Sequence, residues 1–420
     1  MEALQDIRSL SFYFPIPDPE VDYRSKPEAY IDYIFGDQSP NGLVAYLKRN
    51  DLITSFYSYT ETISRGFGFC TIKMELTDEG ASETGKQQIV TALFQYIAII
   101  KRDGITERQY QDIFHIYKMK YNNEDVMAYS VADNIADFLT AHNFEDVLEA
   151  TKLLYRYEPD TIRRYFDYLT PTNMLLVYRS KNFIANNQTR KEQWYGVRYS
   201  IGKIDGEILD QLADPLRSLS DEDQRKLFSS PAANHFIASD TSLRPRDNQN
   251  PDSPELILYN DLFDVFYRQD KKYNTPKATI YCKFTSLAAE QLSSAVHLEL
   301  ATALITDLLS EKLSGAAIAE MKNSIFSSES SIVVKMTGYT EKIGIFARQV
   351  HETLLEFRPD RQRFEALKNV AIREAENERL ASVLAVAHQH LDEMLNTPAF
   401  TSSMRLRDIK GFSTENCCDL

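Results

Sequence analysis

Seven histidines are the residues of this chain best suited to hold a catalytic metal. A zinc site on a helix needs two histidines one turn apart with a glutamate between them, as H-E-x-x-H or the inverse H-x-x-E-H. His351 is followed by Glu352, but Leu355 stands where the second histidine belongs. His142 has a glutamate at the correct offset, but Asp146 replaces the second histidine. No histidine in the sequence completes either motif.

The other histidines also offer no chelating pair. His388 and His390 are two positions apart on an expected helix, so their side chains point about 200° apart and cannot share one ion. The sequence also lacks the G-x-S-x-G, G-x-x-x-x-G-K-[ST] and G-x-G-x-x-G motifs of serine hydrolases, P-loop enzymes and dinucleotide-binding proteins. We therefore predict no catalytic residue, no metal site and no cofactor site in this chain.

The four cysteines form no C-x-x-C pair, which excludes a zinc ribbon or a disulfide framework. Cys70 and Cys282 lie in apolar, strand-like runs, and we expect both to be buried thiols. Free thiols favour a reducing compartment, so the predicted location is cytoplasmic. The first ten residues carry Glu2 and Asp6 and have no apolar core, which is unlike a signal peptide.

The composition is that of a globular protein of two or three domains. The chain has 420 residues, of which 43% are apolar and 26% charged. The 47 basic and 61 acidic residues give a net charge of −14, which argues against a nucleic-acid-binding surface. No run approaches the ~18–20 consecutive apolar residues of a membrane span, so no membrane partner is expected.

The stretch from Leu10 to Gly80 predicts an α+β unit. A strand is expected over Ser11–Ile16, ended by Pro15 and Pro17 because proline cannot donate to a sheet ladder. A helix, a Gly/Pro loop over 36–42 and a second helix follow, and two strands are expected within Ile53–Leu76. This order predicts a mixed or antiparallel sheet packed on helices.

The pattern returns in the second half of the chain. A strand is expected over Lys277–Thr285, two more within Ser324–Tyr339, and a long helix over 360–395. Tyr110 and Phe364 hold the same place in two similar stretches of helix, breaker and capped helix, at an offset of 364 − 110 = 254 residues. Helices are also expected over 127–139 and 144–154. We therefore predict tandem copies of one α+β unit. The second copy is expected to be incomplete, because few residues follow its last helix.

A polar run rich in Ser, Asp, Asn and Pro separates the two copies. Its "SLRPRDNQNPDSP" stretch is the best linker candidate in the sequence. We predict one domain over 1–240, a linker over 241–253 and a partial domain over 254–420.

Several short motifs occur in one order along almost the whole chain. They are Phe14–Asp18 (FPIPD), Arg65–Phe67 (RGF), Leu76–Gly80 (LTDEG), Phe94–Ile97 (FQYI), Trp194–Gly196 (WYG) and Tyr267–Ala278 (YRQDKKYNTPKA). In this order the sequence resembles the insulinase–pitrilysin family of zinc metalloproteases. The resemblance covers the family's middle portion and leaves out the domain with the zinc site. It implies a metalloendopeptidase whose zinc is held outside this chain.

The resemblance also implies a peptide-binding exosite. In the family, a "GHEGPGS"-like loop and a following strand hold a substrate terminus by adding it to a sheet edge. The matching positions here are Gly36, Pro40, Asn41 and Gly42 in the loop, and Phe56, Tyr57, Ser58 and Tyr59 in the strand. Ser58 and Tyr59 replace two glycines of the family. The alternative interpretation is an ordinary sheet edge.

Two functions follow from this resemblance. In the first, the chain forms the wall and exosite of a substrate-enclosing chamber and works with a catalytic half that it does not contain. In the second, it is a stand-alone, catalytically inactive protein that binds peptides or other partners. Expected partners are extended peptides, an insulinase-type catalytic half, or further copies of this chain.

Overall fold

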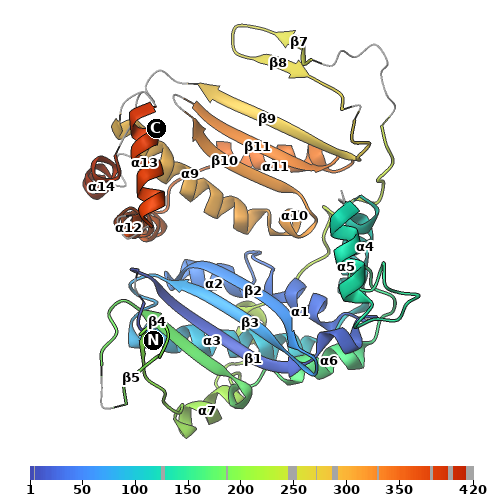
Figure 1. The fold of residues 1–420 in the computed structure, drawn as a ribbon, viewed down its shortest axis with the longest axis vertical. Coiled ribbons are helices and arrows are strands. Elements are labelled where there is room, and N and C mark those ends of the chain that lie inside the picture. The colour runs from blue at the N-terminus through green and yellow to red at the C-terminus, as the bar shows by residue number, and fades with distance from the viewer. Residues whose placement is uncertain are drawn as a thin grey trace.

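We describe the protein from a computed structural model. The structure describes residues 1–3, 5–123, 128–185, 188–244, 253–270, 272–285, 292–328, 331–378, 382–395 and 401–412. The chain folds into two lobes, each built on one sheet, with the N-terminal half in one lobe and the C-terminal half in the other (Figure 1). Residues 245–252 of the predicted linker lie outside the described residues. No helix in the described part of the chain combines the length and apolarity needed to cross a membrane.

The sheet of the first lobe is antiparallel, with the strand order β2-β3-β1-β4. Its strands are β1 (Arg8–Pro17), β2 (Ile53–Ser64), β3 (Phe67–Leu76) and β4 (Leu175–Ser180). Phe12 and Ile72, which face each other across the central pair of strands, are fully buried on the face that packs against helices. Arg65 and Gly66 form the turn between β2 and β3, and the positive φ of 104° at Gly66 is one that glycine adopts without strain.

The first strand continues through its prolines, contrary to our expectation. Pro15 belongs to β1 and pairs with Phe69 of β3. On its other side β4 ends opposite Tyr13, so the missing N–H of Pro15 faces no strand and costs no ladder bond. The Pro15 carbonyl accepts a hydrogen bond from the side chain of Asn173 instead.

Helices cover the apolar face of this sheet. They are α1 (Pro27–Phe35), α2 (Leu43–Arg49), α3 (Glu83–Asp103), α4 (Glu107–Asn122) and α6 (Pro159–Asp167), whereas α5 (Ala128–Phe138) lies at the side of the lobe (Figure 1). Phe94 of α3 packs edge-to-face on Phe14 of β1, which ties this helix to the centre of the sheet. The prediction of a helix over 144–154 is wrong. Residues 144–152 form successive turns, because the Asp146 carboxylate bonds to Tyr23 and Arg24 and fixes the segment against the start of the lobe.

The second lobe repeats the plan of the first. Its elements are β9 (Lys277–Thr285), α9 (Leu292–Lys312), α10 (Ser314–Ile318), β10 (Lys322–Ser328), β11 (Ser331–Tyr339), α11 (Ile343–Leu355) and α12 (Arg361–Asn377). The sheet order β10-β11-β9 matches β2-β3-β1, and within the described residues no strand stands where β4 would be. Thr106 caps α4 and Asp360 caps α12, and Tyr110 and Phe364 are buried at the fourth position of each helix. The predicted tandem α+β repeat with a shorter second copy is confirmed.

Other helices and strands complete the described part of the chain. They are β5 (Arg190–Lys191), β6 (Arg198–Tyr199), α7 (Gly206–Ala213), α8 (Asp221–Leu227), β7 (Glu255–Tyr259), β8 (Asp264–Tyr267), α13 (Val383–Leu395) and α14 (Ser402–Gly411), besides the 3-10 turns Pro19–Asp22 and Pro171–Asn173. The single helix expected over 360–395 is interrupted: α12 ends at Asn377 and α13 begins at Val383, with residues 379–381 outside the described part.

Candidate functional site

The predicted exosite strand, β2, is an edge strand of the first sheet and pairs only with β3 among the described strands. An edge strand presents every second residue's N–H and C=O away from the sheet. Which residues do so in β2 follows from the register of all four strands.

The register can be followed from the opposite edge of the sheet. In β4, Ser180 donates its N–H outward to Met1, so Arg179 and Val177 face β1. Because the direction of the backbone groups alternates along a strand, the N–H and C=O groups of Phe12 in β1 point toward β3. By the same alternation, those of Lys73 in β3 point toward β2.

Lys73 pairs with Tyr57, so the backbone N–H and C=O groups of Tyr57 form hydrogen bonds with β3. Phe56, Ser58 and Thr60 consequently point their N–H and C=O groups outward.

The side chains of the strand alternate between the two faces of the sheet. Phe56 packs against the core of the first lobe, whereas Tyr57 on the opposite face is 60% exposed. Tyr59 is partly buried, and its hydroxyl accepts a hydrogen bond from Lys73 Nζ at 2.8 Å. This bond raises the pKa of Lys73 and holds the Tyr59 ring over the sheet face. The strand thus offers an aromatic face beside its outward backbone groups.

Arg363 of α12 closes the first end of the β2 edge. Its Nη1 donates to the Ile53 carbonyl at 2.7 Å and its Nη2 to the Thr54 carbonyl at 3.1 Å. Asp307 of α9 accepts from Nε at 2.6 Å, and Lys48 of α2 lies 2.8 Å from the same carboxylate. Burial raises the pKa of Asp307, but the Arg363 hydrogen bond and the Lys48 charge outweigh burial and leave the pKa below its usual value.

Asp32 of α1 closes the other end. Its Oδ2 accepts from the Thr60 backbone N–H at 3.4 Å and its Oδ1 from the Thr60 hydroxyl at 2.8 Å. Burial raises the pKa of Asp32 to about 6, although both hydrogen bonds from Thr60 oppose this rise. Between the two closures, the outward groups of Phe56 and Ser58 receive no hydrogen bond from the described residues.

The predicted loop is tied to the second lobe and to its own helix. Asp37 is buried and accepts hydrogen bonds from Ser39 and from Ser314 of α10. The Pro40 carbonyl accepts from Arg49, and the Asn41 carbonyl accepts from the Ser229 N–H.

Both glycines of the loop lie close to backbone. A Cβ at Gly36 would lie 2.8 Å from the Asp32 carbonyl oxygen, and one at Gly42 would lie 3.1 Å from that of Asp37. Among the described residues, no hydrogen bond or ion pair joins loop positions 36–42 directly to strand positions 56–59.

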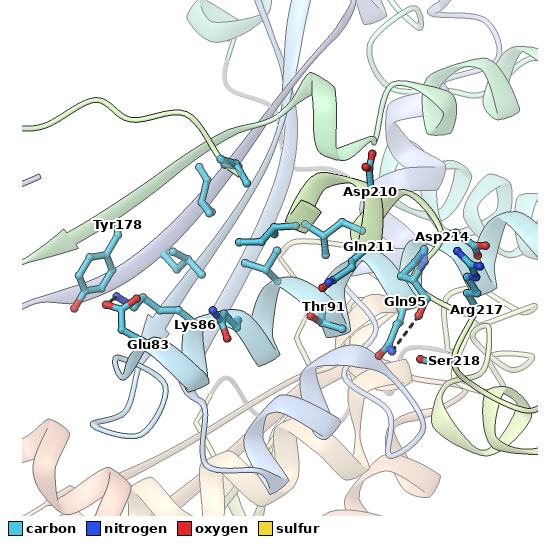
Figure 2. Close-up of a pocket in the computed structure, with 18 residues that line it drawn as sticks. Glu83, Lys86, Thr91, Gln95, Tyr178, Asp210, Gln211, Asp214, Arg217 and Ser218 are labelled. Atoms are coloured by element: carbon cyan, nitrogen blue, oxygen red, sulfur yellow. Dashed lines mark hydrogen bonds and ion pairs between the residues drawn. The ribbon is translucent and has the colours of Figure 1, made fainter. Parts of the chain in front are cut away.

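A groove of about 950 Å³ lies at the opposite edge of the same sheet, between α3, β4 and the stretch around α7 (Figure 2). Its floor is aliphatic and includes Val90, Leu176 and Leu212. Lys86 on its rim pairs with Glu83 at 2.6 Å and lies 4.4 Å from the centre of the Tyr178 ring. The rim carries both positively and negatively charged side chains, so it does not favour a ligand of either charge.

The described residues contain no group of three or more His, Cys, Asp or Glu side chains arranged to hold a metal ion. His142 is buried, and its Nε2 lies 2.9 Å from a carboxylate oxygen of Glu20. His351 is exposed on α11. Sequence reasoning missed Arg363, Asp307 and Asp32, because no local pattern links these residues to β2.

Comparisons with known proteins agree with this architecture. Residues 2–116 match the family model of the peptidase M16 inactive domain, and residues 120–408 match that of the middle or third domain of peptidase M16. The solved structure of pitrilysin superposes with a TM-score of 0.67 at 19% identity, over 99% of this chain and 43% of pitrilysin. This likeness shows the same fold.

Two curated relatives are much longer than this chain. Human insulin-degrading enzyme is 27% identical over 391 residues, which cover 92% of this chain and 37% of the relative. The A-factor-processing enzyme of Saccharomyces cerevisiae is 24% identical over 420 residues, which cover 97% of this chain and 39% of the relative. This chain therefore spans well under half the length of either relative. With the family models matched from residue 2 to residue 408, the chain belongs to the peptidase M16 family of insulinase–pitrilysin metalloproteases, as an inactive domain followed by a middle domain.

Proposed function

We propose that this chain is a non-catalytic part of an insulinase-like zinc metalloendopeptidase that binds extended peptides along the edge of β2. The observation that carries the proposal is the pair of residues with outward-facing backbone groups, Phe56 and Ser58, on an edge strand that also exposes the Tyr57 side chain. An extended peptide can add to such an edge through main-chain hydrogen bonds, with affinity that depends little on peptide sequence.

The chemistry of hydrolysis would come from a catalytic half bearing the zinc motif. In that arrangement the two lobes form a wall of a chamber that encloses the peptide. One relative is named for degrading insulin and another for processing A-factor, which supports polypeptides as the substrate class. The free thiols Cys70 and Cys282 are consistent with a reducing, cytoplasmic setting.

The test is calorimetric titration with an unstructured peptide of insulin-chain length. Ser58→Pro removes the outward N–H of Ser58 and leaves the ladder with β3 intact, because Ser58 faces away from β3. Loss of one ladder bond should weaken binding about three- to tenfold. Ser58→Ala is the matched control, since it keeps the backbone donor and should bind as wild type does. Equal binding by all three proteins, or by none, would make β2 an ordinary sheet edge.

A second experiment separates the two modes of action. Mixing the chain with an M16 catalytic half that carries H-x-x-E-H should give a stable complex on size exclusion and restore peptide hydrolysis. Peptide binding without any complex would favour the stand-alone, catalytically inactive protein instead. We also propose that the chain divides into one domain over 1–240, a linker over 241–253 and a partial domain over 254–420.

A further inference from the structure

We propose that Arg363 and Asp32 limit the peptide segment recognised by β2 to about three to five residues. This inference rests on the peptide binding proposed above and makes it more specific. Arg363 belongs to the second lobe and Asp32 to the first, so the limit is set jointly by both lobes.

The open part of the edge can form a limited number of hydrogen bonds with an added peptide strand. Phe56 and Ser58 each present one N–H and one C=O outward, which is enough for four ladder bonds. In an antiparallel partner these bonds go to two residues that are separated by one, so the paired segment spans about three residues. A residue on either side can still contact Tyr57 or Tyr59 without adding a ladder bond.

The closure by Arg363 is held firmly in place. The guanidinium makes two bonds to Asp307 and two to the carbonyls of β2, and the side chain is only 12% exposed. Asp307 is 16% exposed and is also paired with Lys48, itself 10% exposed. A peptide that extended past Phe56 in this direction would have to displace the guanidinium from both carbonyls.

Two carboxylates, those of Asp32 and Asp18, bind the strand at the other end of the open edge. Asp32 takes both donors of Thr60, and Asp18 accepts from the Thr62 hydroxyl at 3.0 Å and from the Gly66 N–H at 3.0 Å. Carboxylates of the first lobe therefore hold the Thr60 N–H, the hydroxyls of Thr60 and Thr62, and the turn that follows β2. A strand added from outside finds both a backbone donor and a backbone acceptor without a described partner at Phe56 and Ser58, whereas the donor of Thr60 is already bonded to Asp32.

Removing the Arg363 side chain would open space beside β2 and would also free the carbonyls of Ile53 and Thr54. A cavity of about 220 Å³ lies beside the guanidinium and is lined by Lys48 of α2, Leu304 of α9 and Phe357 of the loop before α12, among other residues. Truncation of Arg363 joins this cavity to the strand edge, so a longer peptide can continue toward Ile53.

The experiment measures affinity for unstructured peptides of three, five, seven and nine residues by fluorescence anisotropy. For wild type, affinity should rise up to five residues and then level off. In Arg363→Ala, affinity should continue to rise up to about seven residues, and the seven-residue peptide should bind about tenfold more tightly than it binds wild type, because two more carbonyls accept. Arg361→Ala, which removes an exposed arginine from the same helix turn, should keep the wild-type length profile.

A second variant covers the case in which Arg363→Ala folds poorly. Lysine is not equivalent to arginine at this place, because its ammonium is a compact donor without the planar fork by which Nε, Nη1 and Nη2 of Arg363 reach the carboxylate and both carbonyls at once. Arg363→Lys should therefore keep the charge beside Asp307 and still lengthen the profile, by a smaller amount than Arg363→Ala.

Amide hydrogen exchange on the free protein supplies a readout that needs no peptide. The Thr60 amide should exchange more slowly than those of Phe56 and Ser58, and Asp32→Ala should accelerate Thr60 alone. Fast exchange at Thr60 in wild type would overturn the closure by Asp32.

The outcomes separate this inference from the proposed function. Binding that is sensitive to Ser58→Pro but has the same length profile in wild type and Arg363→Ala would overturn the length limit and leave peptide binding intact. Absence of binding by every peptide would overturn the proposed function and the length limit together.

Discussion

The guanidinium of Arg363 and the carboxylate of Asp307 form a two-point ion pair, with Nε 2.6 Å from Oδ2 and Nη2 2.9 Å from Oδ1. Both residues belong to the second lobe, on α12 and α9. The remaining donors of the guanidinium reach the carbonyls of Ile53 and Thr54 in the first lobe. An ion pair within one lobe therefore positions the group that closes a strand edge of the other.

Asp307→Ala should destabilise the protein strongly. The substitution leaves Arg363 and Lys48 as poorly solvated charges without their carboxylate, and breaking a buried pair in this way costs about 3 kcal/mol. Urea unfolding followed by circular dichroism measures the change. Glu311→Ala, one turn further along α9, is the control and should change stability by less than about 0.5 kcal/mol. Equal stability of the two variants would contradict a structural role for the Arg363–Asp307 pair.

The contribution of Asp307 to the free energy of unfolding should decrease as the pH becomes strongly acidic. Its pKa is lowered in the folded protein, since Arg363 and Lys48 outweigh the effect of burial. The folded state therefore gains stability from the ionised group above the unfolded pKa of about 3.9, and loses it as the pH falls through the lower folded value. The stability difference between wild type and Asp307→Ala should be constant from pH 7 to 5 and shrink toward pH 2. A difference that grew on acidification would show that the pKa is raised instead.

Glu28→Gln should stabilise the protein at alkaline pH. One carboxylate oxygen of Glu28, Oε2, is inaccessible to solvent and has no hydrogen-bond partner among the described residues. Burial raises the pKa of Glu28 to about 7, although the nearby Lys26 lowers it. A raised pKa means that ionisation opposes folding, and this cost grows as the pH rises from about 4 to 7.

The predicted gain for Glu28→Gln is about 2–4 kcal/mol at pH 8, and it should nearly vanish at pH 4. Denaturant melts at the two pH values give the comparison. Glu61→Gln, at an exposed position of β2, should leave stability unchanged at both. A loss of stability at pH 8 in Glu28→Gln would mean that the carboxylate has a stabilising partner.

Gly80→Ala should unfold or severely destabilise the first lobe. A Cβ at Gly80 would lie only 1.8 Å from the Leu52 carbonyl oxygen, a backbone atom that cannot move aside alone. We expect a loss of more than about 3 kcal/mol, measured by thermal melting. Gly344→Ala is the matched control: no atom lies within 4 Å of its Cβ, and the helix position should tolerate or favour alanine. A wild-type melting temperature in Gly80→Ala would contradict the close packing of this turn on Leu52.

Metal analysis of the purified chain should find no stoichiometric zinc. The prediction rests on histidine spacing, because a stable site needs three or four ligands at fixed positions. Dialysis without chelator followed by elemental analysis measures the ratio of zinc to protein. About one zinc per chain, lost in His351→Ala, would contradict the prediction.

The sequence by itself determined the order of elements and their repetition. Helix caps and apolar periodicity are local properties, so Thr106 and Asp360 could mark the starts of α4 and α12 without knowledge of the fold. The same holds for the alternation of Phe56 and Tyr57 across β2. The family motifs likewise lie in short stretches of chain. The prediction failed at residues 144–152, where Asp146 is held by a tertiary contact that overrides helical periodicity.

The tertiary structure alone decided which strand edge has free backbone groups and over how many residues that edge is open. The outward direction of Phe56 and Ser58 follows from the pairing of β1 with both β3 and β4, and β4 lies about 160 residues further along the chain. Arg363 lies 310 residues from Ile53, and Ser314 lies 277 residues from Asp37. Contacts between residues so far apart depend on how the two lobes pack, and side-chain spacing along the sequence carries no information about that packing.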